Sequence, residues 1–120
     1  TRTTIEDILQ VFQVAADAGA TRLGLADSVG FIRPLSMRYL MSHVRDGLPD
    51  SIKKKIPISI HCHNDFGLAS ANTLAAMEEG ISCLHTCIAG FGERAGMAPF
   101  EEVVTISELL YNIDTGIDMG

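Results

Sequence analysis

Short apolar segments alternate with amphipathic segments along this chain, and that alternation restricts the possible folds more than any other feature. The apolar segments span residues 20–27, 56–60 and 81–89. Segments with helical spacing of apolar residues precede, separate and follow them, at residues 5–18, 34–47, 68–79 and from 99 onward. Strands that alternate with helices of this length build βαβ units. The sequence therefore predicts an α/β fold with a parallel sheet.

Several residues mark where the helices should begin and end. Thr3 and Glu6 have the S/T-x-x-E spacing of a capping box, which predicts the start of the first helix. Gly19 is expected to stop that helix, and Pro34 suits the first turn of the next one. The lysine-rich run at residues 50–57 is interpreted as a polar linker.

The size of the chain limits what these units can form. A (βα)₈ barrel needs on the order of 250 residues, whereas this chain has 120. We therefore expect residues 1–120 to be a fragment of one larger α/β domain. The net charge of −6 argues against a nucleic-acid or anionic-membrane partner, and no apolar stretch reaches the roughly 20 residues of a membrane span. The three cysteines lack disulfide spacing, which favours the cytoplasm.

Polar residues follow all three predicted strands, at the edge where α/β proteins place their functional groups. His61 and His63 are two residues apart on an extended segment, so both side chains should point to one face, with Cα atoms about 6.5–7 Å apart. Both imidazoles could then bind one metal ion, while Cys62 points away and packs. The alternative is a pair of structural histidines without a metal.

The other strand ends give weaker signals. Glu93 and Arg94 lie in a glycine-bearing loop that matches neither a dinucleotide-binding motif nor a P-loop. Beside a metal they could position substrate; alternatively they form a surface ion pair. Asp27 and Ser28 could be ordinary capping and turn residues. His85 is expected to be a buried structural histidine within the third strand.

Taken together, these motifs resemble the DRE-TIM metallolyases, the family of 3-hydroxy-3-methylglutaryl-CoA (HMG-CoA) lyase. The similarity is closest to the branch of 2-isopropylmalate, homocitrate and citramalate synthases. Residues 61–72 match the family pattern H-x-H-N-D-x-G-x-A-x-A-N at every stated position, and residues 90–94 match G-x-G-E-R. Residues 27–30 are similar to the family's D-T-x-G motif. The resemblance spans essentially the whole chain.

The resemblance implies that this chain carries strands six to eight of a TIM barrel, with one preceding helix. His61 and His63 would bind a divalent cation (Mg, Mn, Zn or Co). Ser28 stands where the family has a threonine that holds the 2-oxo acid, with Asp27 beside it. Glu93 and Arg94 would be catalytic residues that shape the loop over the site. Met97 departs from the isopropylmalate synthase pattern, which has a metal-binding asparagine at that position.

The activity implied is an acyltransferase reaction that condenses acetyl-CoA with a 2-oxo acid in amino-acid biosynthesis. The family's catalytic arginine, acidic metal ligand and general base have no counterpart in these residues. One alternative is a carbon–carbon lyase or aldolase of the HMG-CoA lyase type, although Glu93 and Arg94 disfavour it. Another is that the isolated fragment has no activity. The expected partners are the 2-oxo acid, the acyl-CoA and further copies of the chain in a homo-oligomer.

Overall fold

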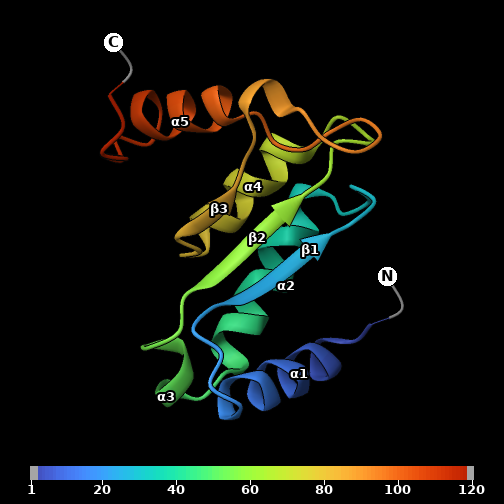
Figure 1. The fold of residues 1–120 in the computed structure, drawn as a ribbon, viewed down its shortest axis with the longest axis vertical. Helices are drawn as coiled ribbons and strands as arrows, with labels where there is room; N and C mark the ends of the chain where they lie inside the picture. Colours follow the sequence, from blue (N-terminus) through green and yellow to red (C-terminus); the bar gives the residue numbers. More distant parts are fainter. Residues whose placement is uncertain (1–2, 119–120) are drawn as a thin grey trace.

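The computed structural model describes residues 3–118 and contains three strands with helices before, between and after them (Figure 1). In chain order the elements are α1 (Ile5–Asp17), β1 (Leu23–Asp27), α2 (Pro34–Gly47), α3 (Asp50–Lys53), β2 (Ile58–Cys62), α4 (Ala69–Glu78), β3 (Cys83–His85), the 3₁₀ turn η1 (Ile88–Gly90) and α5 (Phe100–Leu109). The strands lie in the order β1-β2-β3 and both pairs are parallel. The predicted α/β fold with a parallel sheet is therefore confirmed.

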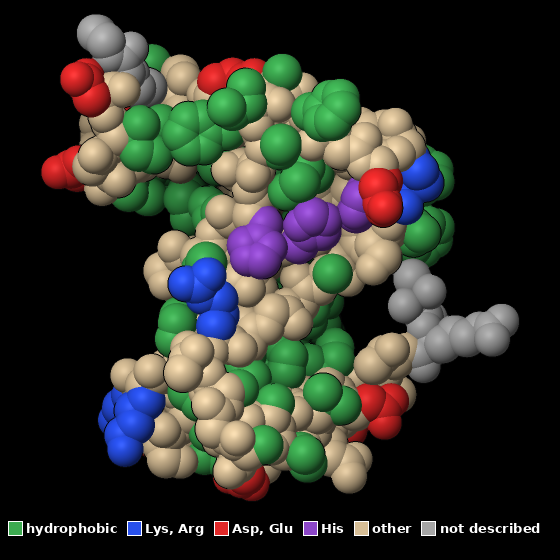
Figure 2. All heavy atoms as spheres, viewed as in Figure 1, with side chains coloured by type: hydrophobic (Ala, Val, Ile, Leu, Met, Phe, Trp, Pro, Cys, Tyr) green, Lys and Arg blue, Asp and Glu red, His purple; other side chains and the backbone are tan. Residues whose placement is uncertain are grey.

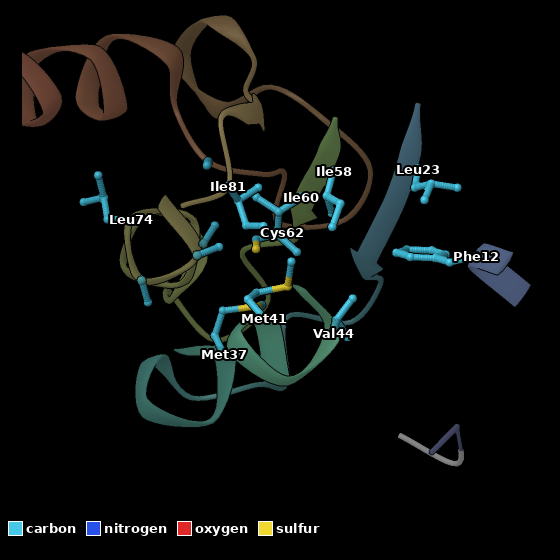
Figure 3. Close-up of a cluster of buried hydrophobic side chains, with 14 of the residues drawn as sticks. Phe12, Leu23, Met37, Met41, Val44, Ile58, Ile60, Cys62, Leu74 and Ile81 are labelled. Carbon is cyan, nitrogen blue, oxygen red and sulfur yellow. The ribbon is translucent and has the colours of Figure 1, made fainter. Parts of the chain in front are cut away.

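One face of the sheet is packed against helices. Ile58, Ile60 and Cys62 of β2 are buried on this side, and they lie among the buried side chains of α2, including Met37 and Met41 (Figure 3). Burying a side chain of this size stabilises a fold by about 1.5–3 kcal/mol. The helix-facing side of the sheet is therefore the main hydrophobic core.

The opposite face of the sheet is different in character, and we call it the open face. In-register neighbours of parallel strands point to the same side, so the open face carries Gly24, Ala26, Ser59, His61, Cys83 and His85. No helix formed by residues 3–118 covers it, and Figure 1 views the sheet from this side. None of the helices in the same residues is long and apolar enough to cross a membrane.

The residue that caps the first helix lies one position later than the sequence predicted. Thr4 caps it: its hydroxyl accepts a hydrogen bond from the Asp7 backbone N–H at 3.1 Å, and the Asp7 carboxylate accepts from the Thr4 N–H at 3.0 Å. The box predicted from Thr3 and Glu6 is thus wrong by one position. Two consecutive threonines each have an acidic residue three positions on, so the local pattern fits both starts equally well.

Two further expectations are corrected in the middle of the chain. The lysine-rich run is not only linker: it forms the short helix α3, whose Ile52 is buried in the core while Lys53 and Lys54 pair with Asp50. The third strand is much shorter than residues 81–89. It ends at His85, and the chain then forms the 3₁₀ turn η1, in which Ala89 has a φ of 52°. Apolar composition alone does not reveal where a strand stops pairing.

Candidate active site

His61 and His63 lie together at the carboxyl end of the central strand. His61 is in β2 and His63 is two residues further along, so both side chains project on the side of the open face. Their ring centroids are 4.9 Å apart, with an interplanar angle of 68°. Cys62 points to the opposite side and is completely buried. The two imidazoles are therefore close enough to bind one cation, as the alternation along the strand predicted.

The surroundings of His61 and His63 are compatible with metal binding, although the two side chains do not form a complete site. Burial, and then the neighbouring His63 and His85, lower the pKa of His61, so its imidazole is neutral and has a free lone pair at neutral pH. The Nδ1 atom of His63 is buried and has no hydrogen-bond partner among residues 3–118. In those same residues, however, no group of three His, Cys, Asp or Glu side chains is arranged to hold a metal ion. The described residues therefore fit a metal site as a partial ligand set.

Cys62 contributes packing and does not complete that set. Burial raises the pKa of its thiol to about 11, so the sulfur stays protonated at neutral pH. A cysteine side chain binds a metal ion as the deprotonated thiolate. The structure and the sequence interpretation of Cys62 therefore agree.

His85 is the functional candidate that the sequence reasoning missed. It was predicted to be a buried structural histidine, but its side chain is exposed on the open face. It pairs in register with His61, and the two ring centroids are 5.8 Å apart. The histidine side chains form a row across this face in Figure 2. The signal that could have revealed His85 is its register with His61, which depends on strand pairing rather than on local sequence.

Arg94 connects the loops that follow all three strands. Its guanidinium donates to both carboxylate oxygens of Asp65, at 2.7 and 3.1 Å, and to the backbone carbonyl of Ser28. Hydrogen bonding from Arg94 lowers the pKa of Asp65, which keeps this carboxylate ionised. Because Asp65 lies two residues after His63 and Ser28 directly follows β1, Arg94 fixes the position of both neighbouring loops. Planar, two-point binding of this kind is specific to arginine.

Close backbone contacts hold the same loops together. Gly30 has a φ of +62°, and a Cβ there would lie 2.5 Å from the carbonyl oxygen of His63. The Asn64 N–H donates to the Gly96 carbonyl at 2.9 Å, and His63 forms an isolated antiparallel bridge with Met97. These glycines allow the first and third loops to approach the second within backbone contact distance. The site is thus built on an interlocked set of loops.

The remaining residues predicted for the site lie in different surroundings. Asp27 is buried and its carboxylate accepts hydrogen bonds from the backbone N–H groups of Phe31 and Ile32, both at 3.1 Å. Its register with Cys62 places its side chain on the helix-facing side, away from the imidazoles, although its backbone carbonyl accepts a hydrogen bond from the His63 N–H at 3.2 Å. Ser28 is exposed at the end of β1, and Glu93 is exposed beside Arg94. The assignment of Ser28, Glu93 and Arg94 to substrate or catalysis remains a prediction.

Replacing Arg94 with alanine is expected to lower catalytic efficiency about a hundredfold, because a displacement of about 1 Å in reacting groups costs that much. The thermal midpoint should change little, because Arg94 and Asp65 are partly exposed and such pairs contribute little stability. Steady-state kinetics and a thermal melt of the full-length protein would measure both. Arg38→Ala is the matched control, since Arg38 pairs with Glu78 away from the strand ends. A change of less than threefold for Arg94→Ala would contradict the positioning role.

Comparisons with known proteins identify the family to which the chain belongs. The model of the HMGL-like family matches residues 1–120. The chain is 44% identical to a 2-isopropylmalate synthase of Methanocaldococcus jannaschii, over 98% of this chain and 21% of the relative. It is 41% identical to a homocitrate synthase of Methanopyrus kandleri, over 98% of this chain and 28% of the relative. The chain thus spans less than a third of either relative.

A solved structure of similar fold is an HMG-CoA lyase from Acinetobacter baumannii in complex with coenzyme A and 3-methylmalate. Its TM-score with this chain is 0.78 at 25% sequence identity, and the match covers 95% of this chain and 37% of that one.

Proposed function

Because this chain belongs to the HMGL-like family, we propose that it is part of an enzyme that condenses acetyl-CoA with a 2-oxo acid on a divalent cation. The observation that carries this proposal is the His61–His63 pair at the carboxyl end of β2, with ring centroids 4.9 Å apart. The two synthases that are 41% and 44% identical to the chain support the acyltransferase class. The proposed cation is Mg, Mn, Zn or Co, since two imidazoles accept several divalent metals.

We also propose that residues 1–120 belong to one TIM-barrel domain and contribute its strands six to eight. The parallel order β1-β2-β3 and the uncovered open face support this, because the inner face of a barrel is closed by strands rather than by helices. The open face would then be the barrel interior and the histidine end its catalytic mouth. By itself the 120-residue chain would be inactive, because it supplies only a partial ligand set.

In the proposed reaction each described residue has a limited task. His61 and His63 would hold the cation, which would supply Lewis-acid polarisation of the carbonyl group of the 2-oxo acid. The hydroxyl of Ser28 binds the substrate carboxylate and so orients the acid. Arg94 keeps the Ser28 and His63 loops at a fixed separation through its bonds to Asp65 and the Ser28 carbonyl. Removal of a proton from the acetyl group of acetyl-CoA falls to a residue outside this chain.

The test is release of the CoA thiol from acetyl-CoA by the full-length protein, measured with a thiol reagent in the presence of different 2-oxo acids. We expect release that depends on a 2-oxo acid, stops on treatment with a chelator and returns when Mn²⁺ or Zn²⁺ is added. Release that proceeds unchanged in the chelator, or no release with any 2-oxo acid, would overturn the proposal.

A lyase is the second candidate, and the similarity to the HMG-CoA lyase structure supports it. The synthases are nevertheless more similar in sequence, at 41–44% against 25% identity. We therefore favour condensation. Direct measurement of acetoacetate formed from HMG-CoA by the full-length protein separates the two, because a condensing enzyme should form none.

A further inference from the structure

A buried asparagine in α4 has no part in the function proposed so far. Asn72 is the last position of the motif at residues 61–72, and its side chain is completely buried. Its amide Nδ2 donates to the Ile32 backbone carbonyl at 2.6 Å, whereas its Oδ1 has no hydrogen-bond partner among residues 3–118. Burying a polar atom without a partner costs stability. Asn72 is thus a costly core residue whose side-chain amide bonds to the loop that follows β1.

The loop that follows β1 is held at both ends by side chains outside it. At its start, the Ser28 carbonyl accepts a hydrogen bond from Arg94. Near its end, the Asp27 carboxylate accepts from the Ile32 N–H at 3.1 Å, and Asn72 donates to the Ile32 carbonyl. Both polar backbone groups of Ile32 are therefore bonded to side chains, one from β1 and one from α4. The conformation of the loop, including the exposed Ser28, depends on these contacts.

The position of α4 is in turn tied to the histidine pair. The turn between β2 and α4 contains His63 and Asn64, and the Asn64 side-chain oxygen accepts a hydrogen bond from the N–H of Ala69, the first residue of α4, at 3.1 Å. Gly30 of the β1 loop packs closely on the same turn, since a Cβ there would lie 2.5 Å from the His63 carbonyl oxygen. Asn72 therefore joins the β1 loop to the βα unit that carries both histidines.

We propose that Asn72 is a positioning residue that sets the separation between the Ser28 hydroxyl and the His61–His63 pair. This inference rests on the proposed condensing function, in which Ser28 binds the carboxylate of the 2-oxo acid beside the cation. A substrate that bridges two such groups binds well only when their separation fits it. Without the Asn72 amide the Ile32 carbonyl loses its donor and the β1 loop can move, whereas the apolar contacts between α4 and β2 remain.

The experiment is steady-state kinetics of the full-length protein with Asn72→Leu, which removes the amide but keeps the number of side-chain heavy atoms. The substrate is pyruvate, 3-methyl-2-oxobutanoate or 2-oxoglutarate, whichever the unsubstituted protein turns over. The KM for the 2-oxo acid should rise at least tenfold, roughly the value of one hydrogen bond to a charged group. The kcat, the KM for acetyl-CoA and the Mn²⁺ affinity by calorimetry should each stay within threefold.

A second substitution tests whether the effect of Asn72 passes through Ser28. If it does, adding Asn72→Leu to Ser28→Ala should raise the KM for the 2-oxo acid less than threefold further, whereas independent effects would multiply. Thr73→Val is the matched control. Thr73 is equally buried on α4, and no hydrogen bond from its side chain to the β1 loop is found within residues 3–118. This control should leave the KM unchanged.

An unchanged KM for the 2-oxo acid, equal rises for both substrates, a tenfold loss of Mn²⁺ affinity or multiplying effects with Ser28→Ala would each overturn the inference while condensation itself still occurred. Asn72→Ser, whose hydroxyl is too short to reach Ile32, carries the same expectation if Asn72→Leu does not fold. If neither variant folds, Asn72 is a structural residue and the inference is wrong. An unsubstituted protein that turns over no 2-oxo acid would overturn the proposed function and this inference together.

Discussion

Replacing His61 with alanine should abolish most metal-dependent turnover, by a factor on the order of a thousand. The cation is proposed to supply several kcal/mol of transition-state stabilisation, and each 1.36 kcal/mol corresponds to about tenfold in rate. His61 offers one of two imidazoles whose ring centroids are 4.9 Å apart, and no third ligating side chain completes a site within residues 3–118. Loss of either imidazole therefore leaves a single ligand from this chain. His63→Ala should have the same effect.

The measurements are CoA release by the full-length protein and Mn²⁺ affinity by calorimetry, with a thermal melt to confirm folding. Stability should fall by no more than about 1 kcal/mol, because His61 is half-buried and makes no hydrogen bond among the described residues. His43→Ala is the control, an exposed histidine on α2. If His61→Ala retained activity within threefold of the unsubstituted protein, the metal assignment would be wrong.

Replacing Gly96 with alanine should be the most disruptive single-methyl change in the loops around the site. Gly96 has a φ of +81°, and a Cβ there would lie 2.0 Å from the carbonyl oxygen of Gly90. The loop must shift, which breaks the bonds from Asn64 N–H to the Gly96 carbonyl and from Met97 N–H to the Gly90 carbonyl. Strain at a positive φ and overpacking together cost about 2–4 kcal/mol. Activity should fall at least a hundredfold, because the shift reaches the residue after His63.

Gly67→Ala separates backbone strain from the steric clash. Gly67 has a similar φ of +69° but nothing lies within 4 Å of the position of its Cβ. Its substitution should cost only about 1 kcal/mol. Chemical denaturation of both variants gives the free energies of unfolding, and the difference between them measures the clash. Equal destabilisation in the two variants would show that the Gly90–Gly96 contact does not constrain the loop.

Much of the architecture follows from short-range patterns in the chain. Helical spacing predicted α1, α2, α4 and α5, and Pro34 and Gly47 bound α2 as expected. These features are local. Apolar periodicity determines which face of a helix is buried, and a proline or glycine ends a helix independently of the segment that follows it. Where two local solutions were equivalent, as with Thr3 and Thr4 at the first cap, the sequence could not choose between them.

The residues of the site also fall into two groups: those whose positions follow from local sequence and those whose positions depend on tertiary contacts. His61 and His63 share one face because successive side chains of a strand alternate, so two residues in one strand were enough to predict their approach. No such local rule exists for His85 or Arg94. His85 reaches His61 through the register of β2 and β3, and Arg94 reaches Asp65 across 29 residues of chain. Asp27 lies on the helix-facing side in register with Cys62, and there its carboxylate accepts hydrogen bonds from two backbone N–H groups of the loop that follows β1.

Residue chemistry along the chain therefore established the two imidazoles at a strand end, the α/β class and the family motifs. Strand pairing established which other side chains stand beside those imidazoles. The physical reason is that alternation and periodicity act between residues a few positions apart, whereas contacts such as Arg94 with Ser28 form only after distant segments have packed. His85 shows the difference most clearly, because its exposure depends on a face of the sheet that no helix within residues 3–118 covers.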